Sequence, residues 1–377
     1  MNHIPTKEEE GEISSAVKSV LSRIKVKDAM PILGGSGAKN TWLPGTHDID
    51  IYVKFNYKKF KDKSELISEF LYKAIKSKFK LTRLHGSRDY FQTKAGKFTV
   101  EIVPILDIKK ADEAKNITDI SQLHVDYVRK YKKLSNEIRL AKLFCKVCEV
   151  YGAESFIQGF SGYVIELLVI HYGSFKNLIK NVVKWKAKTI IGSSKDADNL
   201  NYSKTISPLI LIDPVQKSRN AAAAISEEKY NKFIQTCKSY LKKPSNSFFV
   251  PKVFNLSEIK KKYNLVLEIT PEKGKLDVVG AALKKRFDFL AYTLEKNDFK
   301  ILNKGWHWEN KAYFYFKLAS LTLPKEKEVI GPPLTIKPGV ENFKKVHKKC
   351  YVKSGKLCTK ISRKYPSALS LAKSILR

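Results

Sequence analysis

The sequence predicts an α+β protein of several domains, with a mixed helix and strand domain at each end of a mainly helical middle part. Its 377 residues suffice for two or three domains, and the 43% that are hydrophobic can fill their cores. Helical and strand-like patterns alternate between residues 13 and 106. Apolar residues then recur mainly at helical spacing from 121 to 241, and strand-like patterns return after residue 263.

The first part of the chain predicts a small domain with both helices and strands. Apolar residues at helical spacing predict an amphipathic helix over 13–24, and a glycine-rich turn follows at 34–37. A strand is predicted over 48–55 and a second helix over 64–78. A hairpin is predicted over 91–106, with Ala95 and Gly96 at its turn.

The remaining chain divides into a helical part and a second mixed part. Helices are predicted over 137–150, 161–171 and 227–241, and the polar stretch 242–247 is a candidate linker. Strands at 263–269 and 312–321 flank a long helix at 275–294, and a basic segment follows Gly331. The predicted domains are therefore 1–120, 121–245, 246–330 and 331–377.

The charge of the chain predicts an acidic partner. Lys and Arg number 71 against 37 Asp and Glu, a formal net charge of +34 that is spread along the chain. Nucleic acid is the commonest partner for such a surface, and an anionic membrane is the next. The longest apolar stretch, 163–170, is interrupted by Glu166 and is too short to span a bilayer, so no membrane association is expected.

The cysteines predict a reducing compartment, which we take as the cytoplasm. Five cysteines are an odd and small number for this length, as expected of free thiols. Cys145 and Cys148 form a single C-x-x-C pattern within an apolar helix. No second pair follows at zinc-binding spacing, so they are interpreted as buried helix residues.

Three acidic residues form the central chemical pattern. Because side chains alternate along a strand, Asp48 and Asp50 share the face opposite Ile49 and Ile51. Two adjacent carboxylates repel unless a cation lies between them, and Mg²⁺ binds such oxygen pairs. Glu101, on another apolar strand, can complete a triad for a two-metal reaction. The alternative is a solvated strand face, which would be preferred for an isolated D-x-D pattern.

The glycine-rich turn precedes these carboxylates. Gly35 and Ser36 can present backbone N–H groups and a hydroxyl to phosphates. The turn differs from the lysine-containing nucleotide-binding loop, because no Gly-Lys-Ser or Gly-Lys-Thr follows.

With Gly35-Ser36, Asp48-Ile49-Asp50 and Glu101 in this order, the sequence resembles the DNA polymerase beta-like nucleotidyltransferases. Longer blocks narrow the resemblance to the archaeal (class I) CCA-adding tRNA nucleotidyltransferases. These blocks are Thr41-Trp42-Leu43-Pro44-Gly45, Val100-Glu101-Ile102-Val103-Pro104, Tyr151-Gly152-Ala153-Glu154, Gly159-Phe160-Ser161-Gly162-Tyr163, His171-Tyr172-Gly173-Ser174-Phe175, Ile212-Asp213-Pro214 through Arg219-Asn220, Gly331-Pro332-Pro333 and Arg363-Lys364-Tyr365.

The resemblance implies an N-terminal nucleotidyltransferase domain, a central helical domain and a C-terminal RNA-binding domain with a tail. It implies template-independent addition of two CMP and one AMP to tRNA from CTP and ATP, with two Mg²⁺ ions held by Asp48, Asp50 and Glu101. Nucleotide contacts are implied for Gly35, Ser36, Lys39, His124, Lys142, Tyr151, Ser161 and Arg219. Of these, Arg219 would read the base edge. A homodimer stays open as an assembly.

Several positions depart from the family pattern. Glu101 stands where relatives usually have Asp, Lys39 where they usually have Arg, and Arg88-Asp89-Tyr90 where His-Pro-Tyr is expected. The chain also stops soon after Tyr365, whereas relatives usually continue. We therefore expect any change in tRNA affinity to exceed any change in the chemistry.

Basic clusters in the C-terminal half are candidates for contact with the tRNA backbone, although some are expected to be ordinary solvated lysines. They include Lys284, Lys285, Arg286, Lys344, Lys345, Lys348 and Lys349. The alternative functions are poly(A)-type tailing, a non-catalytic RNA-binding protein and transfer to a small molecule. The carboxylate triad disfavours the second of these, and the charge disfavours the third.

Overall fold

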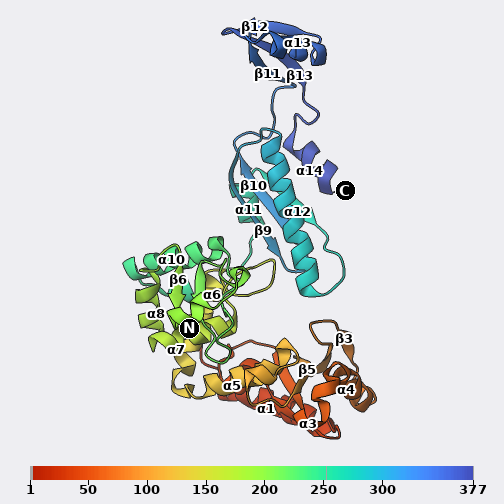
Figure 1. Ribbon diagram of the computed structural model, residues 1–377, viewed down its shortest axis with the longest axis vertical. Coiled ribbons are helices and arrows are strands. Elements are labelled where there is room, and N and C mark those ends of the chain that lie inside the picture. Colours follow the sequence, from red (N-terminus) through yellow and green to blue (C-terminus); the bar gives the residue numbers. More distant parts are fainter. Residues whose placement is uncertain (1–2, 252, 377) are drawn as a thin grey trace. The chain divides into compact units, whose positions relative to one another are not determined.

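The computed structural model describes residues 3–251 and 253–376. The chain forms two compact units, Met1–Lys252 and Val253–Arg377 (Figure 1). Each has its own buried core, as expected for a chain of this length.

The first unit begins with a five-stranded sheet in the order β1-β2-β5-β4-β3. Its strands are β1 (Ala29–Leu33), β2 (Asp48–Phe55), β3 (Thr82–Leu84), β4 (Tyr90–Ala95) and β5 (Phe98–Leu106). Strands β2 and β5 are parallel, and the other neighbours are antiparallel. Helices α1 (Lys7–Arg23) and α4 (Ile67–Ile75) contribute to the same hydrophobic core as the apolar face of β2 and β5. The opposite face of the sheet is therefore the one that carries Asp48 and Asp50.

Helices make up most of the rest of the first unit. They are α5 (Ser121–Arg129), α6 (Ser135–Val147), α7 (Gly162–Tyr172), α8 (Phe175–Val182), α9 (Ser194–Asp198) and α10 (Glu227–Lys242). Two short parallel strands, β6 (Thr189–Ile191) and β7 (Leu209–Leu211), accompany them. One-turn helices α2 (Gly35–Lys39) and α3 (Tyr57–Phe60) flank β2.

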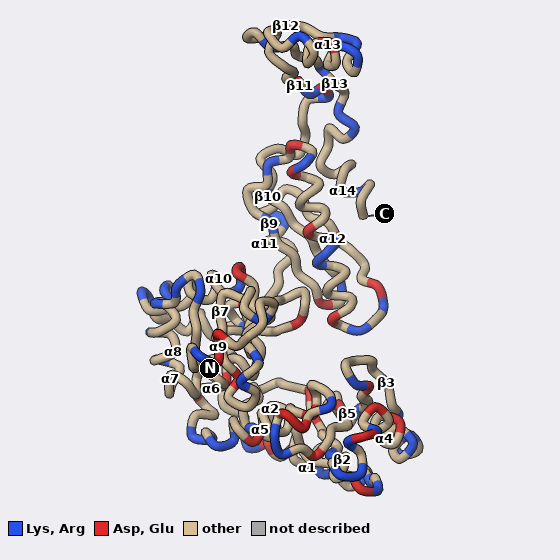
Figure 2. The backbone as a smooth tube through the Cα atoms, in the orientation of Figure 1, with Lys and Arg blue, Asp and Glu red and all other residues tan. Residues whose placement is uncertain are grey.

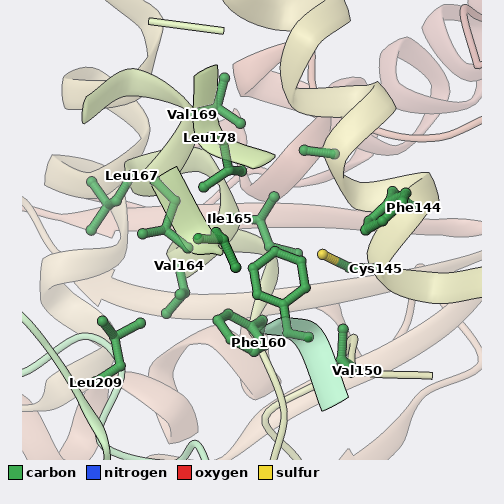
Figure 3. Packing of buried hydrophobic residues seen from close by; sticks show 14 of the residues in the cluster. Phe144, Cys145, Val150, Phe160, Val164, Ile165, Leu167, Val169, Leu178 and Leu209 are labelled. Atoms are coloured by element: carbon green, nitrogen blue, oxygen red, sulfur yellow. The ribbon is translucent and has the colours of Figure 1, made fainter. Parts of the chain in front are cut away.

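The core of this helical part is rich in aromatic residues. Phe144 of α6 is fully buried among apolar side chains of α7 and α8 (Figure 3). Its ring centroid lies 5.4 Å from Phe175, 5.5 Å from Tyr240 and 6.0 Å from Phe248. Because α6 also carries Lys142, this packing fixes the side of the helix on which the lysine projects.

The second unit contains two separate three-stranded antiparallel sheets. The first has the order β8-β10-β9 and packs against α12 (Leu276–Lys296) and α14 (Ala368–Leu376). Its strands are β8 (Leu265–Ile269), β9 (Ile301–Trp308) and β10 (Ala312–Leu318), preceded by α11 (Leu256–Lys262). The second sheet has β11 (Glu326–Pro333), β13 (Lys356–Ser362) and β12 (Cys350–Lys353), with α13 (Lys337–Val346) beside it.

The α+β class predicted from the sequence is confirmed, with differences in detail. The first helix begins at Lys7, earlier than predicted, because Thr6 and Glu9 form a capping box. The predicted glycine turn overlaps the helical turn α2, which extends to Lys39, and the basic end folds into strands and two helices. Cys145 and Cys148 are buried free thiols, as expected. No described helix is long and apolar enough to cross a membrane.

We expect Phe144→Ala to destabilise the first unit by about 3–5 kcal/mol, because a large cavity would open in a core that cannot fully close around it. Hydrogen exchange of α6, α7 and α8 measures the loss without interference from the second unit. Tyr202→Ala is the matched control, since that side chain is 83% exposed. Equal protection of the three helices in both variants would contradict a role for Phe144 as their packing centre.

Candidate active site

Two neighbouring strands bring the three predicted carboxylates to one face of the sheet. Along β2 the residues alternate between buried and more exposed positions, so Asp48 and Asp50 share the more exposed face. Glu101 of β5 lies opposite Asp50 in the parallel register. Gln92 on the next strand donates to Glu101 Oε1 at 3.5 Å. Within residues 3–251 and 253–376, no group of three or more His, Cys, Asp and Glu side chains is gathered tightly enough to enclose a metal ion.

The environment of Asp50 favours its neutral form. Burial raises the pKa of this carboxyl, the charge of Asp48 raises it further, and the ammonium group of Lys39 opposes both. A cation at this face would relieve the repulsion. The donor chemistry therefore fits a hard divalent ion.

The glycine-rich turn is held directly against Asp50. Gly34 N–H donates to the Asp50 carbonyl oxygen at 2.8 Å, and Gly35 adopts a positive φ of 52°. A Cβ atom on Gly35 would lie 1.7 Å from Asp50 Oδ2. Only glycine permits both the left-handed backbone and this close approach. Ser36 follows Gly35 in the first turn of α2.

A buried carboxylate, Glu166, joins the sheet part of the first unit to its helices. Glu166 of α7 is fully buried and accepts from Lys39 Nζ at 2.7 Å and from Lys142 Nζ at 2.7 Å. The Thr41 hydroxyl donates to the same carboxylate at 2.6 Å. Burial alone would raise the pKa of Glu166, but the two ammonium groups outweigh it and lower the pKa to about 2. Glu166 is therefore ionised at neutral pH.

Lys142 has all its donors occupied. Its ammonium group donates to Glu166 Oε1, to the Thr41 carbonyl oxygen at 3.1 Å and to Thr41 Oγ1 at 3.0 Å. An ammonium group has three N–H donors, so these contacts use the full set. Lys142 thus contributes charge to the site while its hydrogen bonds are directed to the protein.

Lys146, one helical turn further along α6, is different. The described residues give it no hydrogen bond or ion pair, and its ammonium nitrogen lies 5.3 Å from the Tyr151 ring centroid. The residue is exposed as a whole, yet surrounding protein lowers its pKa, and the carboxylate of Asp48 acts in the opposite direction. The charge of Lys146 therefore interacts with that of Asp48, and within the described residues its ammonium group has no hydrogen-bond partner.

Tyr151 and Ser161 lie beside these lysines. Burial raises the pKa of the Tyr151 phenol, so it stays protonated. A Cβ on Gly162 would lie 3.0 Å from Tyr151 Oη and 3.6 Å from Lys142 Nζ, which places all three residues together. The Ser161 hydroxyl accepts from Val164 N–H at 3.1 Å and caps α7.

A second buried carboxylate, Asp213, organises the remaining predicted residues. It accepts from His124 Nε2 at 3.0 Å, from Arg219 Nη1 at 2.6 Å and from the Tyr163 hydroxyl at 3.0 Å. Burial would raise the pKa of Asp213, but these hydrogen bonds and charges lower it to about 2. The ring of His124 stacks on Tyr163 at 4.1 Å.

Arg88, which replaces the histidine expected from the family, has a structural partner. Its guanidinium group pairs with the fully buried Asp119 through both nitrogens and donates to the Pro104 carbonyl oxygen at 3.2 Å. Asp119 also accepts from Leu106 N–H at 2.8 Å. The pair therefore anchors the segment between β5 and α5, the helix that carries His124.

The predicted basic residues of the second unit divide into two groups. Lys284 pairs with Asp288 at 2.6 Å, and Arg286 donates to the Leu376 carbonyl oxygen at 3.2 Å, so both have partners within the unit. Lys285 is exposed. Figure 2 shows positive charge along α13, and the exposed lysines at its end and just beyond are Lys344, Lys345, Lys348 and Lys349.

Glu166, Asp213 and Lys146 were not among the residues predicted for the site. The available signal for Glu166 was a single charge within an apolar helix, 163–170. Asp213 stood next to an apolar strand, and Lys146 lies four residues after Lys142 on the same helix. Glu166 and Asp213 were visible in the sequence as charges next to apolar residues. Their partners Lys39 and His124 are distant in sequence, so the pairing could not be predicted.

Three family models match the chain. Residues 13–147 match a nucleotidyltransferase domain, and residues 136–250 match the second domain of a tRNA nucleotidyltransferase. Residues 267–377 match the C-terminal domain of a CCA-adding enzyme. In fold, the chain resembles two structures of the Cid1 poly(U) polymerase. One is a mutant with MgATP (TM-score 0.52, 15% identity) and the other has Mg 3′-dATP bound (0.51, 14%), each covering 66% of this chain and 94% of that one.

The fold and these matches define the class of the protein, which is a nucleotidyltransferase. Curated relatives make the assignment narrower. The CCA-adding enzyme of Nanoarchaeum equitans is 38% identical over 88% of this chain and 84% of its own length. The CCA-adding enzyme of Methanocaldococcus jannaschii is 32% identical over 99% and 88%. The chain belongs to the family of CCA-adding enzymes, as the sequence predicted.

We expect Glu166→Gln to lower the free energy of local opening of α6 and α7 by about 3–5 kcal/mol, because two buried ammonium groups would lose their counter-ion. Hydrogen exchange of peptides spanning 135–172 measures it. Glu12→Gln is the control, since it breaks a pair of similar length, 2.6 Å, between exposed side chains and should change protection little. Equal effects of the two changes would refute the role assigned to Glu166.

Proposed function

We propose that this chain adds two CMP residues and one AMP residue to the 3′ end of tRNA, using CTP and ATP and no nucleic-acid template. This reaction is proposed because the chain belongs to the family of CCA-adding enzymes. The site geometry supports the chemistry, because Glu101 lies opposite Asp50 in the register of β2 and β5 and the glycine turn is held against Asp50. Residence in the cytoplasm and assembly as a homodimer stay predictions.

The carboxylate face is proposed to hold two Mg²⁺ ions through Asp48, Asp50 and Glu101. The raised pKa of Asp50 supports this, because a half-buried carboxyl beside a second carboxyl favours a bound cation. When bound, such ions activate the 3′-hydroxyl and stabilise charge on the phosphates. The protein's part is to keep the three carboxylates on one sheet face, in register, with Asp50 close against the glycine turn.

The triphosphate is proposed to lie between the glycine turn and α6. Ser36 offers a hydroxyl in the first turn of α2, directly after the glycine that lies against Asp50. Lys39 and Lys146 are the cations proposed to contact phosphate directly. Lys142, whose donors are bonded to Glu166 and Thr41, is proposed to contribute positive charge without such a contact. Tyr151, Ser161 and His124 are proposed to complete the binding set.

Arg219 is proposed to read the Watson–Crick edge of cytosine or adenine. Its side chain is 32% exposed, and only one bond from its guanidinium group to protein is recorded among the described residues. Four N–H donors are therefore available, in the fixed fork that suits a base edge and phosphate.

Primer extension tests the reaction. A tRNA that lacks its terminal CCA receives CTP alone, ATP alone, and both together. We expect two additions with CTP alone and a third only when ATP is also present. A ladder of adenylates would instead indicate a tailing enzyme. Binding of tRNA without any product would indicate an inactive RNA-binding protein.

Asp50→Asn should lower the extension rate roughly 1000-fold, because several kcal/mol of charge stabilisation depend on this carboxylate. Its tRNA affinity, measured by filter binding, should change little, since the basic surface is intact. Asp112→Asn, at an exposed position, is the matched control and should retain the parent rate. Near-parent turnover of Asp50→Asn would refute the metal-ligand assignment.

Replacing Lys344, Lys345, Lys348 and Lys349 with Gln should weaken tRNA binding and flatten its dependence on salt. The slope of log affinity against log salt should fall by about 1 for each phosphate that these lysines no longer neutralise. The same replacement of four exposed lysines of the first unit, Lys58, Lys61, Lys73 and Lys76, is the charge-matched control. An unchanged slope in the α13 variant would show that this segment does not bind phosphates.

A further inference from the structure

We propose that Asp213 is a positioning residue that determines nucleotide choice by aiming the guanidinium group of Arg219. This rests on the proposed role of Arg219 in reading the base. Asp213 itself is fully buried, so it acts on the nucleotide through other side chains. Its carboxylate is the common acceptor for groups from three different parts of the first unit.

Hydrogen bonds within the protein fix the backbone position of Arg219. Asp213 N–H donates to the Arg219 carbonyl oxygen at 3.1 Å, and Ile212 forms a bridge with Asn220. The buried side chain of Asn220 accepts from Leu211 N–H at 2.9 Å and donates to the Leu209 carbonyl oxygen at 3.1 Å. The loop from 213 to 219 is thus closed at its base, so Arg219 leaves the backbone at a fixed point.

An ion pair with Asp213 then orients the side chain of Arg219. Arg219 Nη1 donates to Asp213 Oδ2 at 2.6 Å, and this is the only bond recorded for its guanidinium group within the described chain. A flexible arginine that reads bases must lose rotational freedom when the nucleotide binds. Because Asp213 imposes most of that order beforehand, the remaining donors face the base position in a single arrangement.

Groups other than Arg219 hold the carboxylate of Asp213 in place. The Tyr163 hydroxyl and Val215 N–H both donate to Oδ1, at 3.0 and 2.9 Å, while His124 Nε2 contacts Oδ2 at 3.0 Å. Burial raises the pKa of the Tyr163 phenol, and so does Asp213, so this hydroxyl remains a donor. With both oxygens occupied, the carboxylate cannot rotate to release Arg219 at low cost.

This arrangement separates base selection from the lysine contacts to phosphate, and His124 is the one proposed phosphate contact that also pairs with Asp213. Lys39 and Lys142 depend on Glu166, and Arg219 depends on Asp213. Loss of Asp213 should therefore reduce discrimination between bases, while loss of a phosphate-side lysine should slow all nucleotides equally. A residue that only supported the fold would affect every nucleotide to the same extent.

The test measures kcat/KM for CTP and for UTP on a tRNA that lacks CCA, and inhibition by pyrophosphate as a base-independent probe. Asp213→Asn should lower the CTP-to-UTP ratio roughly 10- to 100-fold, the range for loss of one hydrogen bond to a charged group. The inhibition constant for pyrophosphate should change far less than this ratio, because Lys39 and Lys142 keep their partners and only the proposed phosphate contact of His124 is altered. Lys39→Gln, the control, should reduce kcat/KM for both nucleotides by one factor and weaken pyrophosphate binding.

The double variant Asp213→Asn with Arg219→Ala should discriminate no worse than Arg219→Ala alone, because Asp213 acts through Arg219. If Asp213→Asn does not fold, the same proposal is tested with Tyr163→Phe. It removes one bond to the carboxylate and should lower the ratio by a smaller factor.

Equal losses for CTP and UTP in Asp213→Asn, or additive losses in the double variant, would overturn the positioning role while CCA addition by the parent chain stands. Full discrimination by Arg219→Ala would overturn the base-reading role and this inference together. If the parent chain adds no nucleotide at all, the proposed function itself fails, and the inference with it.

Discussion

The buried carboxylate of Glu166 is the interaction on which the arrangement of the site depends. A charge taken out of water is costly unless it is paired and fully hydrogen-bonded, and Glu166 meets both conditions with partners from two parts of the first unit. Lys39 and Thr41 follow the glycine turn, whereas Lys142 and Glu166 lie on α6 and α7. The turn that approaches Asp50 is therefore positioned relative to the helices by charge as well as by packing.

Arg139 strengthens the same junction. It is buried on α6 and donates to the Trp42 carbonyl oxygen at 3.1 Å and to Asn40 Oδ1 at 2.5 Å. Together with Lys142, it binds α6 to the segment between α2 and β2 at several points. A shift of α6 would have to break these buried bonds at once, which explains why sheet and helices form one compact unit.

The sequence predicted what depends on local pattern. Alternation along β2 and β5 was sufficient to place Asp48, Asp50 and Glu101 on one face, and helical spacing was sufficient to locate α6, α7 and α12 within a few residues. It could not predict Glu166 with Lys39 or Asp213 with His124, because these pairs join positions far apart in the chain. The fold of 331–377 was also missed, since its short strands alternate weakly and much of its surface is exposed.

At three positions the residue differs from the one that the sequence resemblance predicts, and the structure shows what surrounds each of them. Lys39 cannot form the two-pronged contact of an arginine, but its single ammonium group suits one oxygen of Glu166 and leaves the other to Lys142 and Thr41. Arg88 replaces a predicted histidine and is neutralised by Asp119, so its charge is kept inside the sheet domain. Glu101 is longer than aspartate by one methylene; it lies opposite Asp50 on the parallel strand, and its carboxylate accepts from Gln92. Lys39 and Glu101 thus keep the charge expected at the site and differ from the expected residues in geometry. The charge of Arg88 is instead used within the fold, where it pairs with Asp119.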